Sequence, residues 1–314
     1  MDENFLVTIA IPVYQRSGMI DDAIESVVSQ LVPGVELLIL DNASTDGTFE
    51  RAQRWSSPQV RVERNPENIG MGMNFLRSIE LARGKWFRYL MSDDKLLPGA
   101  VPLMVDLINL YPDVDFQFSN RLTSQHESVL RSLNLDVVRI ESSKQFIRDQ
   151  KRWKFHAFPA SPNAYCLRRD GMLEMIRNAE FMRLYTTLAE SGHCIDYMIL
   201  SYSAAQAKNI AFIDAPTYCL RVHDGQGSAL YRLNMLLHLT GDYVVVSEIW
   251  RPTWKEKLYF YPHAMHTFLC ALRNARSKGI MKLLKVSIDS LQALLWVLCY
   301  HMGLATSAVK KGGG

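Results

Sequence analysis

Two adjacent carboxylates, Asp93 and Asp94, follow a short apolar run that ends at Met91. A carboxylate pair at the carboxyl end of a buried strand supplies hard oxygen ligands of the kind that Mg²⁺ and Mn²⁺ prefer. The pair therefore indicates a metal centre that could carry a diphosphate. The same residues, followed by Pro98, also fit an ordinary polar turn in which one aspartate caps the next helix.

Short apolar runs alternate with amphipathic stretches over the first 118 residues. Runs typical of strands buried on both faces occur at residues 7–11, 35–40, 60–63, 86–91 and 114–118. Between them, apolar residues recur at helical spacing within residues 20–31, 48–55, 73–82 and 101–108. This alternation predicts an α/β fold with a mostly parallel, doubly wound sheet.

Polar side chains stand where the predicted strands and their connecting loops reach one edge of that sheet. They are Asp41, Asn42, Asn68, Asp93 and Asp94. In doubly wound sheets, ligands bind outside the carboxyl ends of the strands. We therefore expect these side chains to converge on one ligand site.

The pattern weakens between residues 123 and 162, a region that fits either a binding loop or an irregular surface segment. Beyond it, residues 163–167 could return to the sheet, and residues 170–179 and 195–207 have helical spacing. Asp196 falls in the first turn of the second of these helices, where the helix dipole alone could explain it. Two short strands are then predicted at residues 210–213 and 217–222.

The composition is that of an ordinary globular protein. With 314 residues, 48% apolar and 21% charged, the chain fits one large domain or one domain with an extension. Its five cysteines form no Cys-x-x-Cys pair, which argues against a disulfide framework and a zinc site. The acidic residues at the start and the early strand pattern do not resemble a signal peptide, so the expected location is the cytoplasm.

The basic residues are concentrated near the end of the chain. From Tyr231 onward there are 11 Lys and Arg against 4 Asp and Glu, a balance of +7, which leaves −4 for the remainder of the total of +3. No strand pattern occurs there, so a helical extension is predicted. Residues 291–309 carry no charge and follow three lysines, which favours a helix docked on the main domain or lying at a membrane surface. A plain packed helix in a soluble subdomain fits the same pattern.

Four segments in a fixed order carry a family resemblance. They are residues 7–14, ending in Ile-Pro-Val-Tyr; the polar residues 41–48; the loop Asn-Pro-Glu-Asn-Ile-Gly at residues 65–70; and Ser92-Asp93-Asp94. Together they resemble the family 2 glycosyltransferases of the GT-A fold, over about residues 5–228 and most closely up to residue 118. The resemblance implies a Rossmann-like nucleotide-sugar-binding catalytic domain at residues 1–228 and a helical extension at residues 229–314.

The resemblance also implies roles for individual residues. Binding of the nucleotide sugar is expected from Pro12, Val13, Tyr14, Asp41, Asn68, Ser92 and Asp93, with the Asp41 carboxylate accepting a ring N–H of the base. A divalent cation, Mg²⁺ or Mn²⁺, is expected at Asp93, Asp94 and His223. The family often has Asp where this chain has Met91, which bears on one contact to the sugar or ribose.

Asp196 occupies the position that the resemblance gives to the catalytic base. The family usually has Glu where this chain has Ile195, so the match is incomplete. An inverting sugar transfer needs one carboxylate to take the proton of the acceptor hydroxyl as its oxygen attacks C1. The departing diphosphate is stabilised by the metal, so no second acid is required.

These observations predict a metal-dependent, inverting glycosyltransferase of the hexosyl or deoxyhexosyl type. The expected partners are a nucleoside-diphosphate sugar, a saccharide or lipid-linked acceptor, and the inner face of a membrane, by analogy with bacterial surface-polysaccharide synthesis. A catalytically inactive nucleotide-sugar-binding or scaffold protein is one alternative. A nucleotidyltransferase is another, although the usual glycine-rich phosphate loop after the first strand is missing. Nucleic-acid binding fits less well, because the basic tail lacks regularly interleaved aromatic residues.

Overall fold

The computed structural model describes residues 5–123, 138–151, 161–191, 195–221 and 249. The chain divides into two compact units, one made of residues 1–147 and 156–223, the other of residues 148–155 and 224–314. Almost all of the described residues belong to the first unit. The predicted domain boundary at residue 228 falls outside the described residues and stays a prediction, as does the helical extension.

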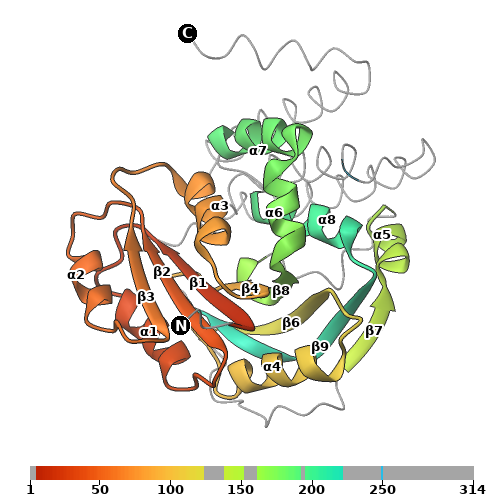
Figure 1. The fold of residues 1–314 in the computed structure, drawn as a ribbon, viewed down its shortest axis with the longest axis horizontal. Coiled ribbons are helices and arrows are strands. Elements are labelled where there is room, and N and C mark those ends of the chain that lie inside the picture. Colours follow the sequence, from red (N-terminus) through yellow and green to blue (C-terminus); the bar gives the residue numbers. More distant parts are fainter. Residues whose placement is uncertain (1–4, 124–137, 152–160, 192–194, 222–248, 250–314) are drawn as a thin grey trace, which may run out of the picture. The chain divides into compact units, whose positions relative to one another are not determined.

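The described part of the first unit is built on one nine-stranded sheet (Figure 1) with the order β3-β2-β1-β4-β8-β6-β9-β5, and β7 pairs with β9. The strands are β1 (Val7–Val13), β2 (Val35–Asp41), β3 (Val60–Arg64), β4 (Trp86–Tyr89), β5 (Lys95–Leu96), β6 (Phe116–Thr123), β7 (Val138–Ser142), β8 (Tyr165–Arg168) and β9 (Asn209–Leu220). Strands β3, β2, β1 and β4 run parallel to one another, and β6 runs parallel to β9. Strand β8 runs antiparallel between β4 and β6, and β5 and β7 are antiparallel to β9.

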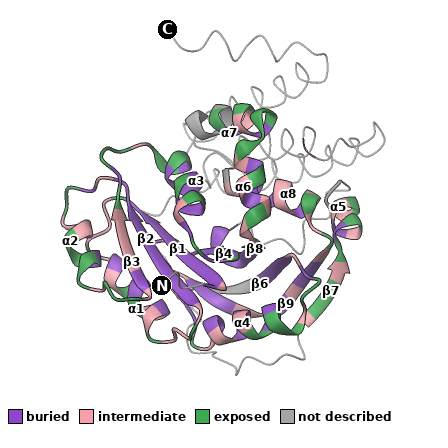
Figure 2. Cartoon of the chain, viewed as in Figure 1, coloured by how far each residue is buried: buried purple, intermediate pink, exposed green. Residues whose placement is uncertain are grey.

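Helices cover both faces of the sheet. They are α1 (Ile20–Val28), α2 (Thr48–Gln53), α3 (Met71–Leu81), α4 (Ala100–Leu110), α5 (Ser143–Lys151), α6 (Arg169–Arg177), α7 (Ala179–Ser191) and α8 (Ile195–Gln206), with a short 3₁₀ helix, η4 (Pro162–Ala164). Figure 1 shows α1 and α4 on one side of the sheet and α3, α6, α7 and α8 on the other. Strands β1 and β2 are buried along their whole length, which Figure 2 shows as the purple centre of the sheet. The predicted α/β fold with a mostly parallel, doubly wound sheet is confirmed.

One predicted strand end is wrong, because β1 continues through Pro12 to Val13. The carbonyl of Val13 accepts the N–H of Asn42 beyond β2, whereas the carbonyl of Ala10 accepts the N–H of Leu90 beyond β4. Alternate residues of β1 therefore face β2 and β4, and Pro12 faces the β4 side. Since β4 ends at Tyr89, opposite Ala10, the N–H that proline lacks breaks no bond of the sheet.

The two short strands predicted at residues 210–213 and 217–222 are one strand, β9. Its pairing with β6 is interrupted where Ile213 lies opposite Ser119 and Pro216 lies opposite Asn120. Asp214 and Ala215 are therefore extra residues in β9, as in a β-bulge. Asp214 and Pro216 lie at this irregularity.

Gly84 lies where the turn between α3 and β4 approaches the backbone of β1. A Cβ atom on Gly84 would lie 2.3 Å from the backbone nitrogen of Thr8 and 2.5 Å from the carbonyl carbon of Val7. We expect Gly84→Ala to lower the free energy of unfolding by about 3 kcal/mol or more, because neither backbone atom can move away cheaply. Urea unfolding measures this.

Gly171→Ala in α6 is the matched control, because a Cβ atom there meets no atom within 4 Å. It should raise the free energy of unfolding by about 0.5–1 kcal/mol, the usual gain from replacing a glycine in a helix. Equal stabilities for the two variants would contradict the close approach at Gly84.

Candidate active site

The carboxyl ends of β1, β2 and β4 lie next to one another, so the structure brings most of the predicted site residues to one edge of the sheet. Pro12 and Val13 end β1 and are buried, whereas Tyr14, just beyond them, is 44% exposed. Asp41 is the last residue of β2, and residues 92–94 follow β4. His223 lies outside the described residues.

Asp41 is fully buried at the end of β2. Its Oδ2 atom accepts the N–H of Ser44 at 3.0 Å and lies 3.3 Å from Nε of Arg64. Its Oδ1 atom is buried and has no hydrogen-bond partner among the described residues. A buried carboxylate oxygen without a partner is costly, so this atom is available to a ligand that donates a hydrogen bond.

Four asparagines fix the loop at residues 65–70 against the end of β2. Nδ2 of Asn42 donates to Oδ1 of Asn68 at 2.7 Å, and Oδ1 of Asn42 accepts from Nδ2 of Asn65 at 2.9 Å. Nδ2 of Asn65 also donates to Oδ1 of Asn74, the first buried polar residue of α3, at 2.8 Å. The sequence pattern indicated Asn42 and Asn68 but missed Asn65 and Asn74. The presence of three asparagines within residues 65–74 could have indicated them.

Several side chains of the polar segment 41–48 accept hydrogen bonds from the backbone of the loop that follows β1. The N–H groups of residues 15–17 donate to Ser44, Thr48 and Asp46 at 2.9, 2.8 and 3.0 Å. Burial of Asp46 opposes ionisation, but hydrogen bonds from Thr48 and Ser17 outweigh it and lower the pKa of Asp46 to about 2. These contacts tie the loop after β1 to the loop after β2 and so support Tyr14 and Asp41.

Asp93 and Asp94 differ in their surroundings. Asp94 is buried, and its two carboxylate oxygens accept hydrogen bonds from Nδ2 of Asn163 at 2.6 Å and from the N–H of Arg221 at 3.1 Å. Asp93 is partly exposed. Burial, together with the negative charge of Asp93, raises the pKa of Asp94 to about 7. The pair therefore concentrates negative charge that a cation would offset.

The carboxylate pair fits a hard divalent cation. Mg²⁺ in proteins is often held by one or two carboxylates, with phosphate oxygens and water completing its coordination. Across the described ranges, no three His, Cys, Asp or Glu side chains converge on a point suited to a metal. Asp93 and Asp94 would thus supply the protein ligands found in this part of the chain, and a bound diphosphate would supply others.

Asp196 lies in the first turn of α8, as predicted, and is partly buried. Its backbone carbonyl accepts a hydrogen bond from the hydroxyl of Tyr165 at 3.4 Å. Burial raises the pKa of the Asp196 carboxyl. Burial and then the charge of Asp196 raise the pKa of Tyr165 and of Tyr185 well above the usual range. Tyr165 begins β8, two residues after Asn163, which is bonded to Asp94.

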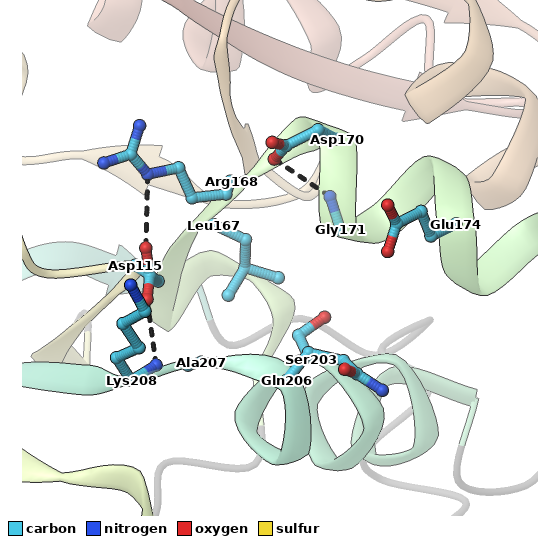
Figure 3. Close-up of a pocket in the computed structure, with 10 residues that line it drawn as sticks. All are labelled: Asp115, Leu167, Arg168, Asp170, Gly171, Glu174, Ser203, Gln206, Ala207 and Lys208. Atoms are coloured by element: carbon cyan, nitrogen blue, oxygen red, sulfur yellow. Dashed lines mark hydrogen bonds and ion pairs between the residues drawn. The ribbon is translucent and has the colours of Figure 1, made fainter.

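A separate polar pocket of about 330 Å³ lies between α6, α8 and the end of β8 (Figure 3). Arg168, which lines it, pairs with Trp86 at the first residue of β4, so the pocket lies at the sheet edge opposite Asp41 and Asp94. Figure 3 shows Asp115 between Arg168 and Lys208; Nε of Arg168 is 3.5 Å from its carboxylate, and the N–H of Lys208 donates to it at 2.8 Å. This pocket contains none of the predicted site residues.

A doubly wound sheet that gathers a buried carboxylate, Asp41, and an Asp-Asp pair at one edge is the arrangement expected of the GT-A fold. Residues 8–176 match the family model described as glycosyl transferase family 2. The chain therefore belongs to the family 2 glycosyltransferases, and the predicted resemblance is confirmed.

Curated relatives match over part of the chain. Abequosyltransferase RfbV of Salmonella typhimurium is 31% identical over 114 residues, which cover 35% of this chain and 34% of that protein. The putative teichuronic acid biosynthesis glycosyltransferase TuaG of Bacillus subtilis is 34% identical over 92 residues, covering 29% of this chain and 36% of that protein. The matches to these two relatives thus span about a third of their length.

Solved structures share the fold over most of the chain. TarS of S. aureus, residues 1–349 in complex with UDP, superposes with a TM-score of 0.62 at 14% identity, covering 93% of this chain and 82% of that one. The mannosyltransferase PcManGT of Pyrobaculum calidifontis, in complex with GDP-Man and Mn²⁺, gives a TM-score of 0.55 at 17% identity, covering 96% of this chain and 84% of that one. At these identities the likeness establishes the fold.

None of the described helices is both long and apolar enough to cross a bilayer. The uncharged stretch at residues 291–309 lies outside the described residues.

Proposed function

We propose that the protein is a metal-dependent, inverting glycosyltransferase. It would transfer a hexosyl or deoxyhexosyl group from a nucleoside-diphosphate sugar to a saccharide or lipid-linked acceptor. The observation that carries this proposal is the pairing of two features at one sheet edge: the buried, unpartnered Oδ1 of Asp41 and the Asp93–Asp94 pair. The first suits a base, and the second suits a diphosphate with its cation.

The nucleoside would lie across the ends of β1 and β2. Pro12 and Val13 form the floor, and the exposed ring of Tyr14 offers a face to the base. Oδ1 of Asp41 would accept a ring N–H, a feature that uracil, thymine and guanine share. Asn68, held by Asn42, borders this site.

Asp93 is the better direct ligand for Mg²⁺ or Mn²⁺, because it is partly exposed, while Asp94 is buried. Asp94 keeps further lone pairs, so it remains the second candidate ligand. When bound, the cation would neutralise the charge that develops on the leaving diphosphate. Ser92 precedes Asp93 and would lie beside the bound donor. His223 remains a predicted ligand.

Asp196 is the proposed catalytic base. Its raised pKa suits proton transfer near neutral pH better than the pKa of an ordinary aspartate would. The acceptor hydroxyl oxygen would attack C1 of the sugar as the bond between C1 and the diphosphate oxygen breaks. The hydroxyl proton passes to the Asp196 carboxylate, and the nucleoside diphosphate leaves with the bonding electron pair.

The acceptor class rests on the relatives. RfbV is named as an abequosyltransferase, and TuaG as a putative teichuronic acid glycosyltransferase, so bacterial polysaccharide synthesis is the proposed setting.

An inactive nucleotide-sugar-binding protein is the second candidate, supported by Met91 and Ile195 standing where the family has acidic residues. Turnover by the wild-type protein separates the two.

A thermal-shift panel with UDP, dTDP, GDP and CDP, each with and without Mn²⁺, tests the donor site. Asp41→Asn should weaken binding of the preferred nucleotide about 10- to 100-fold, because the buried acceptor loses its negative charge. Arg64→Gln is the matched control. It removes the ion pair to Oδ2 but leaves Oδ1 in place, so it should bind nearly as the wild type does. Equal binding by wild type and Asp41→Asn would contradict the base contact.

A further inference from the structure

Asn163 joins the two ends of the carboxylate turn, defined here as residues 91–94. It lies in η4 and is completely buried. Its Oδ1 atom accepts the N–H of Met91 at 2.6 Å, and its Nδ2 atom donates to Oδ2 of Asp94 at 2.6 Å. One amide side chain thus holds both the first residue and the last residue of the turn.

Asn163 is itself anchored from the centre of the sheet. Its backbone carbonyl accepts a hydrogen bond from a terminal nitrogen of Arg88 at 2.8 Å, and the same nitrogen donates to Oγ1 of Thr217 at 2.7 Å. Arg88 is buried in β4, and Thr217 lies in β9. This contact fixes η4 relative to the strands on either side, so the position of Asn163 is set by the sheet.

Arg221 holds the opposite side of the carboxylate turn. Its backbone N–H donates to Oδ1 of Asp94 at 3.1 Å, and its Nε donates to the carbonyl of Asp93 at 2.6 Å. Its terminal nitrogens reach the carbonyls of Met19 and Ser92 at 3.1 and 3.4 Å and the carboxylate of Asp22 at 2.7 Å. A planar guanidinium with five donors can make the four side-chain contacts at once, which a lysine cannot do.

We propose that Asn163 and Arg221 are positioning residues that hold the carboxylate turn in the arrangement that the metal and diphosphate require. This inference rests on the proposed function. Asp93 and Asp94 repel each other, so a turn without these contacts would be free to separate the two carboxylates. Residues that hydrogen-bond to metal ligands orient those ligands, and replacing such a residue typically weakens metal binding about 10- to 100-fold.

The test uses the full chain carrying Arg221→Lys or Asn163→Ser. Mn²⁺ is titrated in the presence of saturating UDP or GDP, whichever the wild type binds, and binding is followed by the electron paramagnetic resonance signal of free Mn²⁺. Both variants should bind Mn²⁺ about 10- to 100-fold more weakly. Binding of UMP or GMP without metal should stay unchanged, because Asp41, the proposed base contact, makes no hydrogen bond to Asn163 or Arg221.

Arg169→Lys is the matched control, because Arg169 also donates to backbone carbonyls, those of Ile79 and Glu80, at 2.9 Å each, away from the turn. Wild-type Mn²⁺ affinity in both site variants would overturn the proposal. Metal-free nucleotide binding that weakens as much as Mn²⁺ binding does would also overturn it, because such a loss indicates a general structural role. If Asn163→Ser fails to fold, the partly exposed Arg221 still gives the test. A wild-type protein without metal-dependent nucleotide binding would overturn the proposed function as well.

Discussion

Asparagine in place of Asp196 should lower kcat by about 10²- to 10⁴-fold, the usual contribution of a general base. Asparagine has nearly the same shape, and its side-chain oxygen can still accept the N–H of Tyr197, to which Asp196 is bonded at 2.9 Å. It has no basic oxygen to take the acceptor proton. Donor binding should therefore persist while turnover is lost, and isothermal titration with the nucleoside diphosphate and Mn²⁺ measures the binding.

The same substitution should leave the fold at least as stable at neutral pH. Burial raises the pKa of Asp196, so the folded state binds this proton more tightly than the unfolded chain does. The free energy of unfolding therefore falls as the pH rises above the ordinary aspartate pKa, and the neutral amide avoids this loss. A residue that lowers stability while serving chemistry is common in active sites.

Asp170→Asn is the control for Asp196→Asn. Asp170 occupies the corresponding position in the first turn of α6, and its Oδ1 also accepts the next backbone N–H, that of Gly171, at 2.9 Å. If Asp196 only caps a helix, the two variants should behave alike. Full turnover by Asp196→Asn would contradict the proposed base.

The second large effect is expected from the double variant Asp93→Asn, Asp94→Asn. In the wild type, a nucleoside diphosphate with Mn²⁺ at a hundredfold excess over Kd should raise the free energy of unfolding by about 2.7 kcal/mol. The double variant should lose the metal-dependent part of this gain, because amides are neutral and far weaker ligands for a hard cation than carboxylates. Thermal shift with and without Mn²⁺ measures it directly.

The matched double variant is Asp113→Asn, Asp115→Asn, which removes two carboxylates near the opposite edge of the sheet. It should keep the full metal-dependent shift even if its baseline stability changes through the lost contact between Asp115 and Arg168. A metal-dependent shift that survives in the Asp93, Asp94 variant would rule out the carboxylate turn as the metal centre.

The alternation of strands and helices was enough to predict the first half of the fold, because each β-α-β unit there is local in sequence. It also placed Asp41, Asp93 and Asp94 at one edge, since parallel strands end together. The position of β8 could not be predicted in this way. Nothing in the short run at residues 163–167 specifies that it lies antiparallel between β4 and β6.

That strand position is why the contacts of Asp94 were missed. Asn163 and Arg221 bind Asp94 although they lie 69 and 127 residues further along the chain. The periodicity of a sequence does not predict contacts between residues so far apart. In the segment 41–48, by contrast, the sequence motif did not distinguish site residues from structural ones. Asp46 and Thr48 accept hydrogen bonds from the loop at residues 15–17, whereas Oδ1 of Asp41 has no partner among the described residues.

The proposed base site and the carboxylate turn differ in how far apart their parts lie in the sequence. The loops around the proposed base site at Asp41 are joined by contacts within residues 15–74, all of low or moderate sequence separation. The carboxylate turn is completed only when the chain has reached Arg221, and long loops of this kind are slow to close. If Asp41 binds the base as proposed, a partly folded chain would complete the base site before it completes the carboxylate turn.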